Sequence, residues 1–177
     1  GYSIGLSADG NTLISGGGSD NSSKGAAWIF TRNEGNWTQQ GDKLVGTQNT
    51  DILQQGRSVS ISADGNTAIV GGYHGYTGIG AIWTYKRTGN IWSQQGERLS
   101  GSGGVGNSSQ GQGIALSADG TRAIVGGYRD NSSMGAAWIF KYVPQPIISS
   151  FSPVNAGSGA SITVRGSGFT DLTSLSF

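Results

Sequence analysis

The tetrapeptide Ser-Ala-Asp-Gly stands at residues 7–10, again at 62–65 and a third time at 117–120, so it returns with a period of 55 residues. The segments around it repeat in the same register. Three tryptophans share one frame of the repeat: Trp28, Trp83 and Trp138. Repeats of this kind mark a supersecondary unit that buries its apolar surface by stacking on copies of itself. The period therefore predicts three equivalent units, at about residues 1–55, 56–110 and 111–143.

The second unit is complete, and its pattern predicts four antiparallel strands. Residues 58–62 alternate polar and apolar side chains, Asp64-Gly65 supplies a tight turn, and the apolar run 67–70 completes a hairpin. A third strand, rich in aromatic and β-branched residues, is expected at 81–85. A more polar fourth strand is expected at 92–95, where it would form an outer edge in contact with water.

Both faces of each small sheet are expected to be covered, because the second and third strands are apolar at consecutive positions instead of alternate ones. Neighbouring sheets of the repeat would cover them. Four antiparallel strands per unit with both faces buried are typical of a β-propeller blade. The sequence thus predicts an all-β fold, a partial propeller of three four-stranded blades.

The third unit is expected to be incomplete. It follows the repeat through Phe140, but Tyr-Val-Pro-Gln-Pro at 142–146 replaces the turn and the fourth strand. In many propellers a strand from the other end of the chain completes the last blade, and we expect that closure here; divergence of a terminal cap is the alternative. Because both chain ends fall inside predicted elements, we also expect further blades in a longer parent chain, and self-association of this segment without them.

A second domain is predicted after a stiff linker formed by Pro144-Gln145-Pro146. Residues 147–177 contain three strand-like runs, which are too few to close a sandwich of about 100 residues. They are expected to form the first part of such a domain.

The repeat resembles the FG-GAP repeat of integrin-alpha-like propellers, in its bacterial secreted form. The matching residues are Gly-Arg-Ser-Val at 56–59, Ser-Ala-Asp-Gly-Asn-Thr at 62–67, Ile-Val-Gly-Gly at 69–72 and Gly-Ala-Ile-Trp at 80–83. Two departures are that Gln55-Gly56 stands where the family has Phe-Gly, and that Val-Gly-Gly stands where it has Gly-Ala-Pro.

The tail from Ile147 resembles the start of an IPT/TIG domain, which has an immunoglobulin-like fold. The matching motifs are Ser-Phe-Ser-Pro at 150–153 and Ile-Thr-Val-Arg-Gly-Ser-Gly-Phe at 162–169. Together the two resemblances imply a recognition or adhesion module of a secreted or cell-surface protein.

The resemblance to integrin-type blades also raises the question of calcium, which those blades hold in their first hairpin. Calcium takes six to eight oxygen ligands. The equivalent turn here, Ala8-Asp9-Gly10-Asn11-Thr12, has one carboxylate and is too short to wrap an ion, and the other two copies are alike in this. We therefore expect an Asp-Gly β-turn and no metal or other cofactor.

Composition excludes several classes of partner. The net charge is +1, only 12% of residues are charged, and no run of Lys or Arg occurs, so the electrostatic footprint of a nucleic-acid or anionic-lipid binder is missing. No apolar stretch approaches the roughly 20 residues that span a bilayer. The chain has no cysteine, which removes disulfides and thiolate chemistry.

Two motifs match catalytic patterns by chance. Gly1-Tyr2-Ser3-Ile4-Gly5 fits the Gly-x-Ser-x-Gly nucleophile elbow, but Ser3 occupies a repeat strand with no helix behind it. Residues 101–106 fit Gly-x-Gly-x-x-Gly, yet a loop follows instead of a helix. His74 is the only histidine, and no spacing nominates a pair of carboxylates. We expect no enzymatic activity.

Binding is expected on the face formed by the longer loops, because the copies differ most there and loops carry recognition on a constant scaffold. The candidate residues lie in the second-to-third-strand loops: Asp20, Asn21, Tyr73, His74, Tyr76, Tyr128, Arg129, Asp130 and Asn131. The expected partner is an extracellular protein or carbohydrate. The alternative is a structural spacer or accessory module of a larger secreted enzyme.

Overall fold

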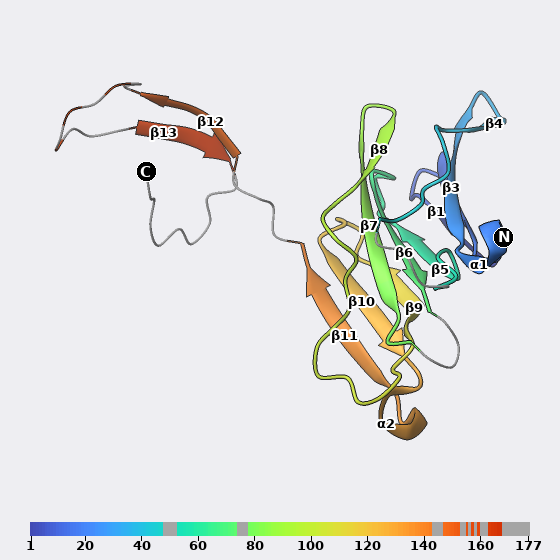
Figure 1. Ribbon diagram of the computed structural model, residues 1–177. Coiled ribbons are helices and arrows are strands. Elements are labelled where there is room, and N and C mark those ends of the chain that lie inside the picture. The colour runs from blue at the N-terminus through green and yellow to red at the C-terminus, as the bar shows by residue number, and fades with distance from the viewer. Residues whose placement is uncertain are drawn as a thin grey trace. The chain divides into compact units, whose positions relative to one another are not determined.

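The structure is a computed structural model that describes residues 1–47, 53–73, 78–142, 147–152, 155, 157, 159 and 163–167. The chain divides into two compact units, Gly1–Tyr142 and Val143–Phe177. The first unit contains three antiparallel sheets, one for each repeat (Figure 1).

Each sheet follows chain order, so its strands run up and down. The first sheet contains β1 (Ser3–Leu6), β2 (Thr12–Gly17), β3 (Ala26–Asn33) and β4 (Asn36–Gln39). The second sheet contains β5 (Ser58–Ile61), β6 (Thr67–Gly72), β7 (Ala81–Thr88) and β8 (Ile91–Gln94). The third sheet contains β9 (Gln110–Leu116), β10 (Arg122–Gly127) and β11 (Ala136–Lys141). The predicted β-rich repeat is confirmed, with four strands in the first two copies and three described in the last.

The Asp-Gly turns close the first hairpin of every sheet. The backbone N–H of Gly10 donates to the carbonyl of Ser7 at 3.0 Å, and the other two copies repeat this bond at 3.0 and 2.9 Å. The same turns join the sheets, because the N–H of Ala8 donates to the carbonyl of Ala63 at 3.0 Å, and Ala63 donates in turn to Ala118 at 2.9 Å. The repeat is thus regular between sheets as well as within them.

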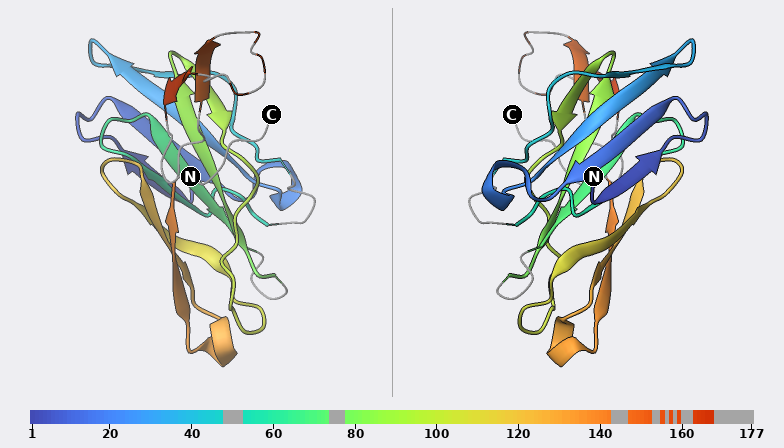
Figure 2. Two further views of the ribbon diagram at one scale, coloured as in Figure 1. Left: turned by 90° about the vertical axis from the view of Figure 1, so that its left-hand side faces the viewer. Right: turned by 90° about the vertical axis from the view of Figure 1, so that its right-hand side faces the viewer.

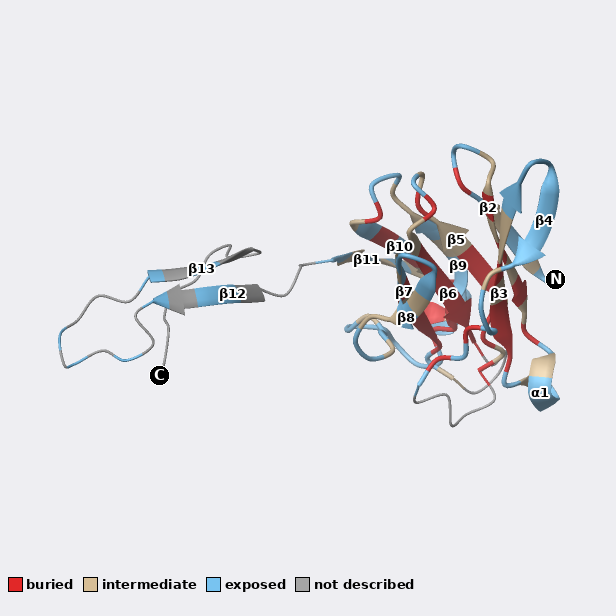
Figure 3. Ribbon diagram, turned by 90° about the horizontal axis from the view of Figure 1, so that it is seen from above, coloured by how far each residue is buried: buried red, intermediate tan, exposed pale blue. Residues whose placement is uncertain are grey.

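The core lies between the sheets, where Figure 3 shows the buried residues concentrated. The middle sheet is covered on both faces, as its consecutive apolar positions predict: Ile69, Val70, Ile82 and Trp83 are fully buried. Glycines permit the close approach. A Cβ atom built on Gly16 of β2 would lie only 2.1 Å from the carbonyl oxygen of Gly56, which precedes β5. One on Gly71 would lie 2.3 Å from the carbonyl oxygen of Gly111.

The loops that follow β2 and β10 contain short turns that the sequence did not predict. These are α1 (Asp20–Ser23) and α2 (Asp130–Ser133). In α1, Asn21, Ser22 and Ser23 have φ of 47°, 56° and 68°, so the backbone is left-handed, and α2 repeats this conformation. Left-handed turns are rare outside glycine, because the Cβ atom crowds the next carbonyl.

The second unit is described only in part. Its strands β12 (Ile147–Ser152) and β13 (Thr163–Ser167) pair antiparallel, with a register shift between Ile148 and Ser150. They correspond to the first two strand-like runs after the prolines.

Candidate functional site

The up-and-down strand order places the loops at two opposite ends of the stacked sheets. Figure 2 shows α1 and α2 at one end and the β3–β4 hairpin turn at the other. The β2–β3, β6–β7 and β10–β11 connections therefore share one end of the stack. We call this the loop end; it is the face on which the sequence predicts binding.

A guanidinium group lies between two tyrosine rings at the loop end. The Cζ atom of Arg57 is 4.5 Å from the centre of the Tyr2 ring and 5.4 Å from the centre of the Tyr73 ring. Its Nη2 also donates a 3.4 Å hydrogen bond to the Tyr73 hydroxyl. Such cation–π contacts hold both partners in defined orientations. Gly18 makes room for this side chain, since a Cβ there would lie 3.0 Å from both Cγ and Cδ of Arg57.

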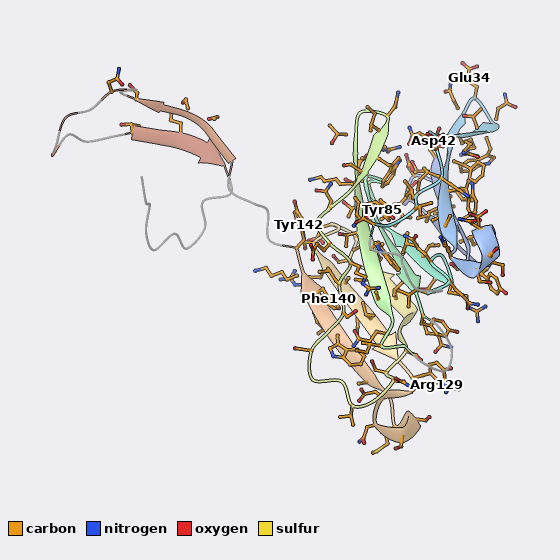
Figure 4. All side chains as sticks on the ribbon, in the orientation of Figure 1. Glu34, Asp42, Tyr85, Arg129, Phe140 and Tyr142 are labelled. Atoms are coloured by element: carbon orange, nitrogen blue, oxygen red, sulfur yellow. The ribbon has the colours of Figure 1, made fainter. Side chains whose placement is uncertain are left out.

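The contacts continue into the third repeat. The rings of Tyr73 and Tyr128 meet edge to face, with centroids 6.2 Å apart and planes at 79°. Nε of Arg129 donates to the Tyr128 hydroxyl at 2.8 Å, and its Cζ lies 5.4 Å from the Tyr128 ring centre. Figure 4 labels Arg129 beside α2 at the loop end.

These side chains form one connected group across all three repeats, which we call the aromatic–arginine row: Tyr2, Arg57, Tyr73, Tyr128 and Arg129. Tyr2 and Tyr128 are 58% and 41% exposed, whereas Tyr73 is buried between them. The row therefore exposes two tyrosine rings, and contacts with Arg57, Tyr73 and Arg129 hold these rings in place.

The structure brings together Tyr73, Tyr128 and Arg129 of the predicted residues and adds Tyr2 and Arg57, which the sequence reasoning missed. A signal for both was present. Tyr2, Arg57 and Gln112 occupy the same frame of the repeat and differ completely, while their neighbours in the first strand are conserved in type. Divergence between the copies of the repeat was the reason to expect binding at the loops, and the same criterion points to this position.

The acidic candidates do not join the row. Asp130 is buried, and its carboxylate accepts a 2.7 Å hydrogen bond from the backbone N–H of Val105. Asp130 therefore ties the segment around Val105, which connects the second and third sheets, to α2. The sequence had predicted Asp130 on an exposed loop. Asp20, half-buried in α1, forms an ion pair with Lys43.

The remaining candidates lie beside the row or outside the described residues. Asn21 and Asn131 are exposed within the left-handed turns, and the Asn131 N–H donates to the Val105 carbonyl at 3.0 Å. His74 and Tyr76 lie outside the described residues.

The Asp-Gly turns use their carboxylates internally. Asp9 accepts from the Ser7 hydroxyl at 2.5 Å and from the Asn11 N–H at 3.0 Å, and Asp64 and Asp119 make the equivalent bonds. These hydrogen bonds hold the pKa of Asp9 and Asp64 below the usual value and that of Asp119 at about 2. The carboxylates thus act as turn caps, an arrangement that does not fit a calcium cradle. The described part of the chain contains no cluster of three or more metal-ligating His, Cys, Asp or Glu side chains.

Ser3 does not stand at a nucleophile elbow. It lies within β1, and β1 leads through the Asp-Gly turn into β2, where an elbow needs a helix. Within the residues that the structure covers, no helix is both long and apolar enough to cross a bilayer.

No protein-family model matches the chain, and no curated protein matches it. Among solved structures, it is similar to TolB from Acinetobacter baumannii, with 16% sequence identity and a TM-score of 0.46. The match covers 78% of this chain but only 29% of the TolB chain.

Proposed function

We propose that this chain is a non-enzymatic recognition module, which binds an extracellular protein or carbohydrate through the aromatic–arginine row. The observation that carries the proposal is the continuous contact from Tyr2 through Arg57 and Tyr73 to Tyr128. Each of the three repeats contributes to it, so the surface exists only when the sheets are stacked.

The chemistry of the row suits recognition better than catalysis. Tyrosine offers a large contact area at a small cost in conformational entropy, and Tyr and Arg are enriched at the centres of binding surfaces. Arg57 and Arg129 already use their guanidinium groups to fix neighbouring tyrosines, so the surface is ordered before a ligand arrives. Preorganisation reduces the entropy that binding must overcome.

The row favours a ligand with an apolar face and oxygen acceptors. The open faces of Tyr2 and Tyr128 can pack on apolar groups, and a guanidinium group carries several donors that suit hydroxyl, carbonyl or carboxylate oxygens. Sugars meet this description, and so does an extended polypeptide that presents apolar side chains beside its backbone carbonyl groups.

We also propose the family of the repeat, the type of the second domain and the location of the protein that the sequence predicts. The three sheets are FG-GAP-like blades of a propeller, residues 147–177 begin an IPT/TIG-type domain, and the protein acts at a cell surface or after secretion. The repeat of three stacked sheets with Asp-Gly turns in one register supports the blade assignment. The motifs at 150–153 and 162–169 support the IPT/TIG assignment, and the location follows from the two resemblances.

The test is a binding screen followed by paired substitutions. The chain is applied to an array of defined oligosaccharides and to a panel of purified extracellular proteins. Every ligand found is measured again with Tyr2→Ala, Arg57→Ala and Tyr128→Ala. We expect each to weaken binding about tenfold or more, which corresponds to roughly 1.4 kcal/mol.

The control is a matched pair at the opposite end of the sheets. Arg32 lies with its Cζ 5.9 Å from the Trp37 ring on the β3–β4 hairpin, so Arg32→Ala removes the same kind of contact elsewhere. Binding that survives all three row substitutions in folded protein would refute the assignment. Binding to no oligosaccharide or protein on either panel would favour the structural-spacer alternative.

A further inference from the structure

Equivalent apolar residues are buried or exposed according to their place in the stack. Ile14 and Ile69 occupy one frame of the repeat and are fully buried. They lie on the same side of their strands as Gly16 and Gly71, which approach the backbone of the following repeat. Ile124, in the same frame of the third sheet, is 48% exposed. Ile29 of the first sheet is likewise buried, and its counterpart Ile139 is 76% exposed. We call the surface of β10 and β11 around Ile124 and Ile139 the trailing face.

The outer side of the first sheet, which no other described sheet of the first unit covers, shows the complementary surface. Val59 of β5 is buried against the first sheet, and Ile61 packs against the same core. Their counterparts in β1, Ile4 and Leu6, are 72% and 55% exposed. We call this surface of β1 the leading face. The chain already joins a leading face to a trailing face twice, between its first and second and its second and third sheets.

Backbone geometry shows that, among the described residues of the first unit, no sheet packs on the trailing face. Gly16 and Gly71 are in contact with the carbonyl groups of Gly56 and Gly111, which belong to the following repeat. Gly126 stands in the same frame, yet a Cβ on it would lie 3.6 Å from its nearest neighbour, an atom of its own sheet. The glycine backbone on which a following sheet packs in the first two repeats is therefore present in the third, and no described residue of the first unit covers it.

The tryptophans give the same picture at the leading end. The N–H of Trp83 donates to the Thr47 carbonyl at 3.0 Å, and that of Trp138 donates to the Ser102 carbonyl at 2.9 Å. In both cases the link that leaves the preceding sheet lies across the ring. Trp28, in the same frame, instead borders a pocket of about 460 Å³ whose lining also includes Ser15 and Gly17.

We infer that the leading and trailing faces are a self-complementary pair, and that a second copy of this chain docks its β1 face on the β10–β11 face of the first. The occupant is identified by the molecule itself, because the second sheet buries both faces against copies of the same repeat. The two faces are different surfaces, so the association is head to tail. Such heterologous contacts continue into rings or open arrays and do not stop at a twofold dimer.

The experiment measures mass by sedimentation velocity and light scattering as a function of protein concentration. The unmodified chain is expected to form species larger than a monomer as concentration rises. Ile139→Lys should block the trailing face and Leu6→Lys the leading face, since each places a charge in the apolar contact. Each variant alone is expected to remain a monomer.

Mixing the two variants distinguishes specific docking from nonspecific association. Ile139→Lys retains a good leading face and Leu6→Lys a good trailing face, so the mixture should form a one-to-one heterodimer and nothing larger. The control is Ile91→Lys on β8, where the isoleucine is 74% exposed but belongs to neither face; it should associate like the unmodified chain.

Three results would overturn the inference. They are an unmodified chain that stays monomeric at every concentration, a mixture that gives no heterodimer, or an Ile91→Lys control that abolishes association as fully as the face variants. Circular dichroism on every variant verifies that the sheets are folded. Both target residues are solvent-exposed in one copy, so their substitution leaves its core intact.

Discussion

The side-chain amide of Gln55 donates a 2.9 Å hydrogen bond to the hydroxyl of Tyr85 in the interior of the first unit. Its Oε1 atom accepts a second bond of 2.9 Å from the backbone N–H of Gly46. Gln55 is fully buried, and burial raises the pKa of Tyr85 to about 12, so the phenol is neutral throughout the physiological range. One amide thus ties the link between two sheets to a core strand (Figure 4 labels Tyr85).

Replacing Gln55 by alanine is expected to lower the free energy of unfolding by about 1 to 3 kcal/mol, because it leaves the Gly46 N–H unpaired in the interior. Urea denaturation followed by circular dichroism measures the change. The control is Gln39→Ala, whose exposed amide donates to the Gly41 carbonyl; it should alter stability by less than about 0.5 kcal/mol. Equal effects of the two substitutions would show that Gln55 is not a structural tie.

The Asp119 carboxyl is expected to titrate at about pH 2, well below its ordinary value of 3.8, because the Ser117 hydroxyl and the Thr121 N–H stabilise its charged form. A folded-state pKa below the unfolded one stabilises the fold above about pH 4. That contribution is lost as the pH falls through the folded value. A chemical-shift titration of the carboxyl carbon measures the midpoint.

The matched variant for this titration is Ser117→Ala, which removes the first cause of the shift. The midpoint of Asp119 should rise toward its ordinary value. A midpoint that stays near pH 2 without the Ser117 hydroxyl would mean that the turn stabilises the carboxylate in another way.

The left-handed turn α2 predicts a stabilising substitution. Ser132 has a φ of 60°, which costs a residue with a Cβ atom about 1 to 2 kcal/mol. Ser132→Gly removes that conformational cost. Glycine also has more conformational freedom in the unfolded chain, which offsets part of the benefit, so we expect the free energy of unfolding to rise by about 0.5 to 1 kcal/mol. Thermal unfolding detects it. Ser93→Gly, within strand β8, should instead lower stability; a loss at Ser132 as well would contradict the turn geometry.

The sequence was sufficient to predict the sheets because their determinants are local. Asp64-Gly65 sits between an alternating strand and an apolar strand, and a tight hairpin is the structure that satisfies both. The period then transfers this hairpin to the other copies. The residues of the middle sheet are apolar at consecutive positions, and the structure buries both of its faces.

The aromatic–arginine row was predicted only in part, because it depends on contacts between sheets. Nothing local in the sequence shows that Arg57 reaches Tyr2, and the space for its side chain exists only because Gly18 stands where the other copies have tyrosine. The burial of Asp130 was missed for a related reason. Its partner, the Val105 N–H, lies in a link that differs between repeats.

The central claim is that equivalent sheets stack through cleared glycine backbone, and one comparison of unfolding free energies tests it most directly. Alanine replaces the glycine at the equivalent position of two repeats, in the variants Gly16→Ala and Gly126→Ala. Both variants are unfolded with urea at a low protein concentration. A methyl group at Gly16 would lie 2.1 Å from the Gly56 carbonyl oxygen, whereas the nearest atom at Gly126 is 3.6 Å away. The account predicts a loss of about 2 kcal/mol or more for Gly16→Ala and less than about 0.5 kcal/mol for Gly126→Ala. Equal losses would contradict it.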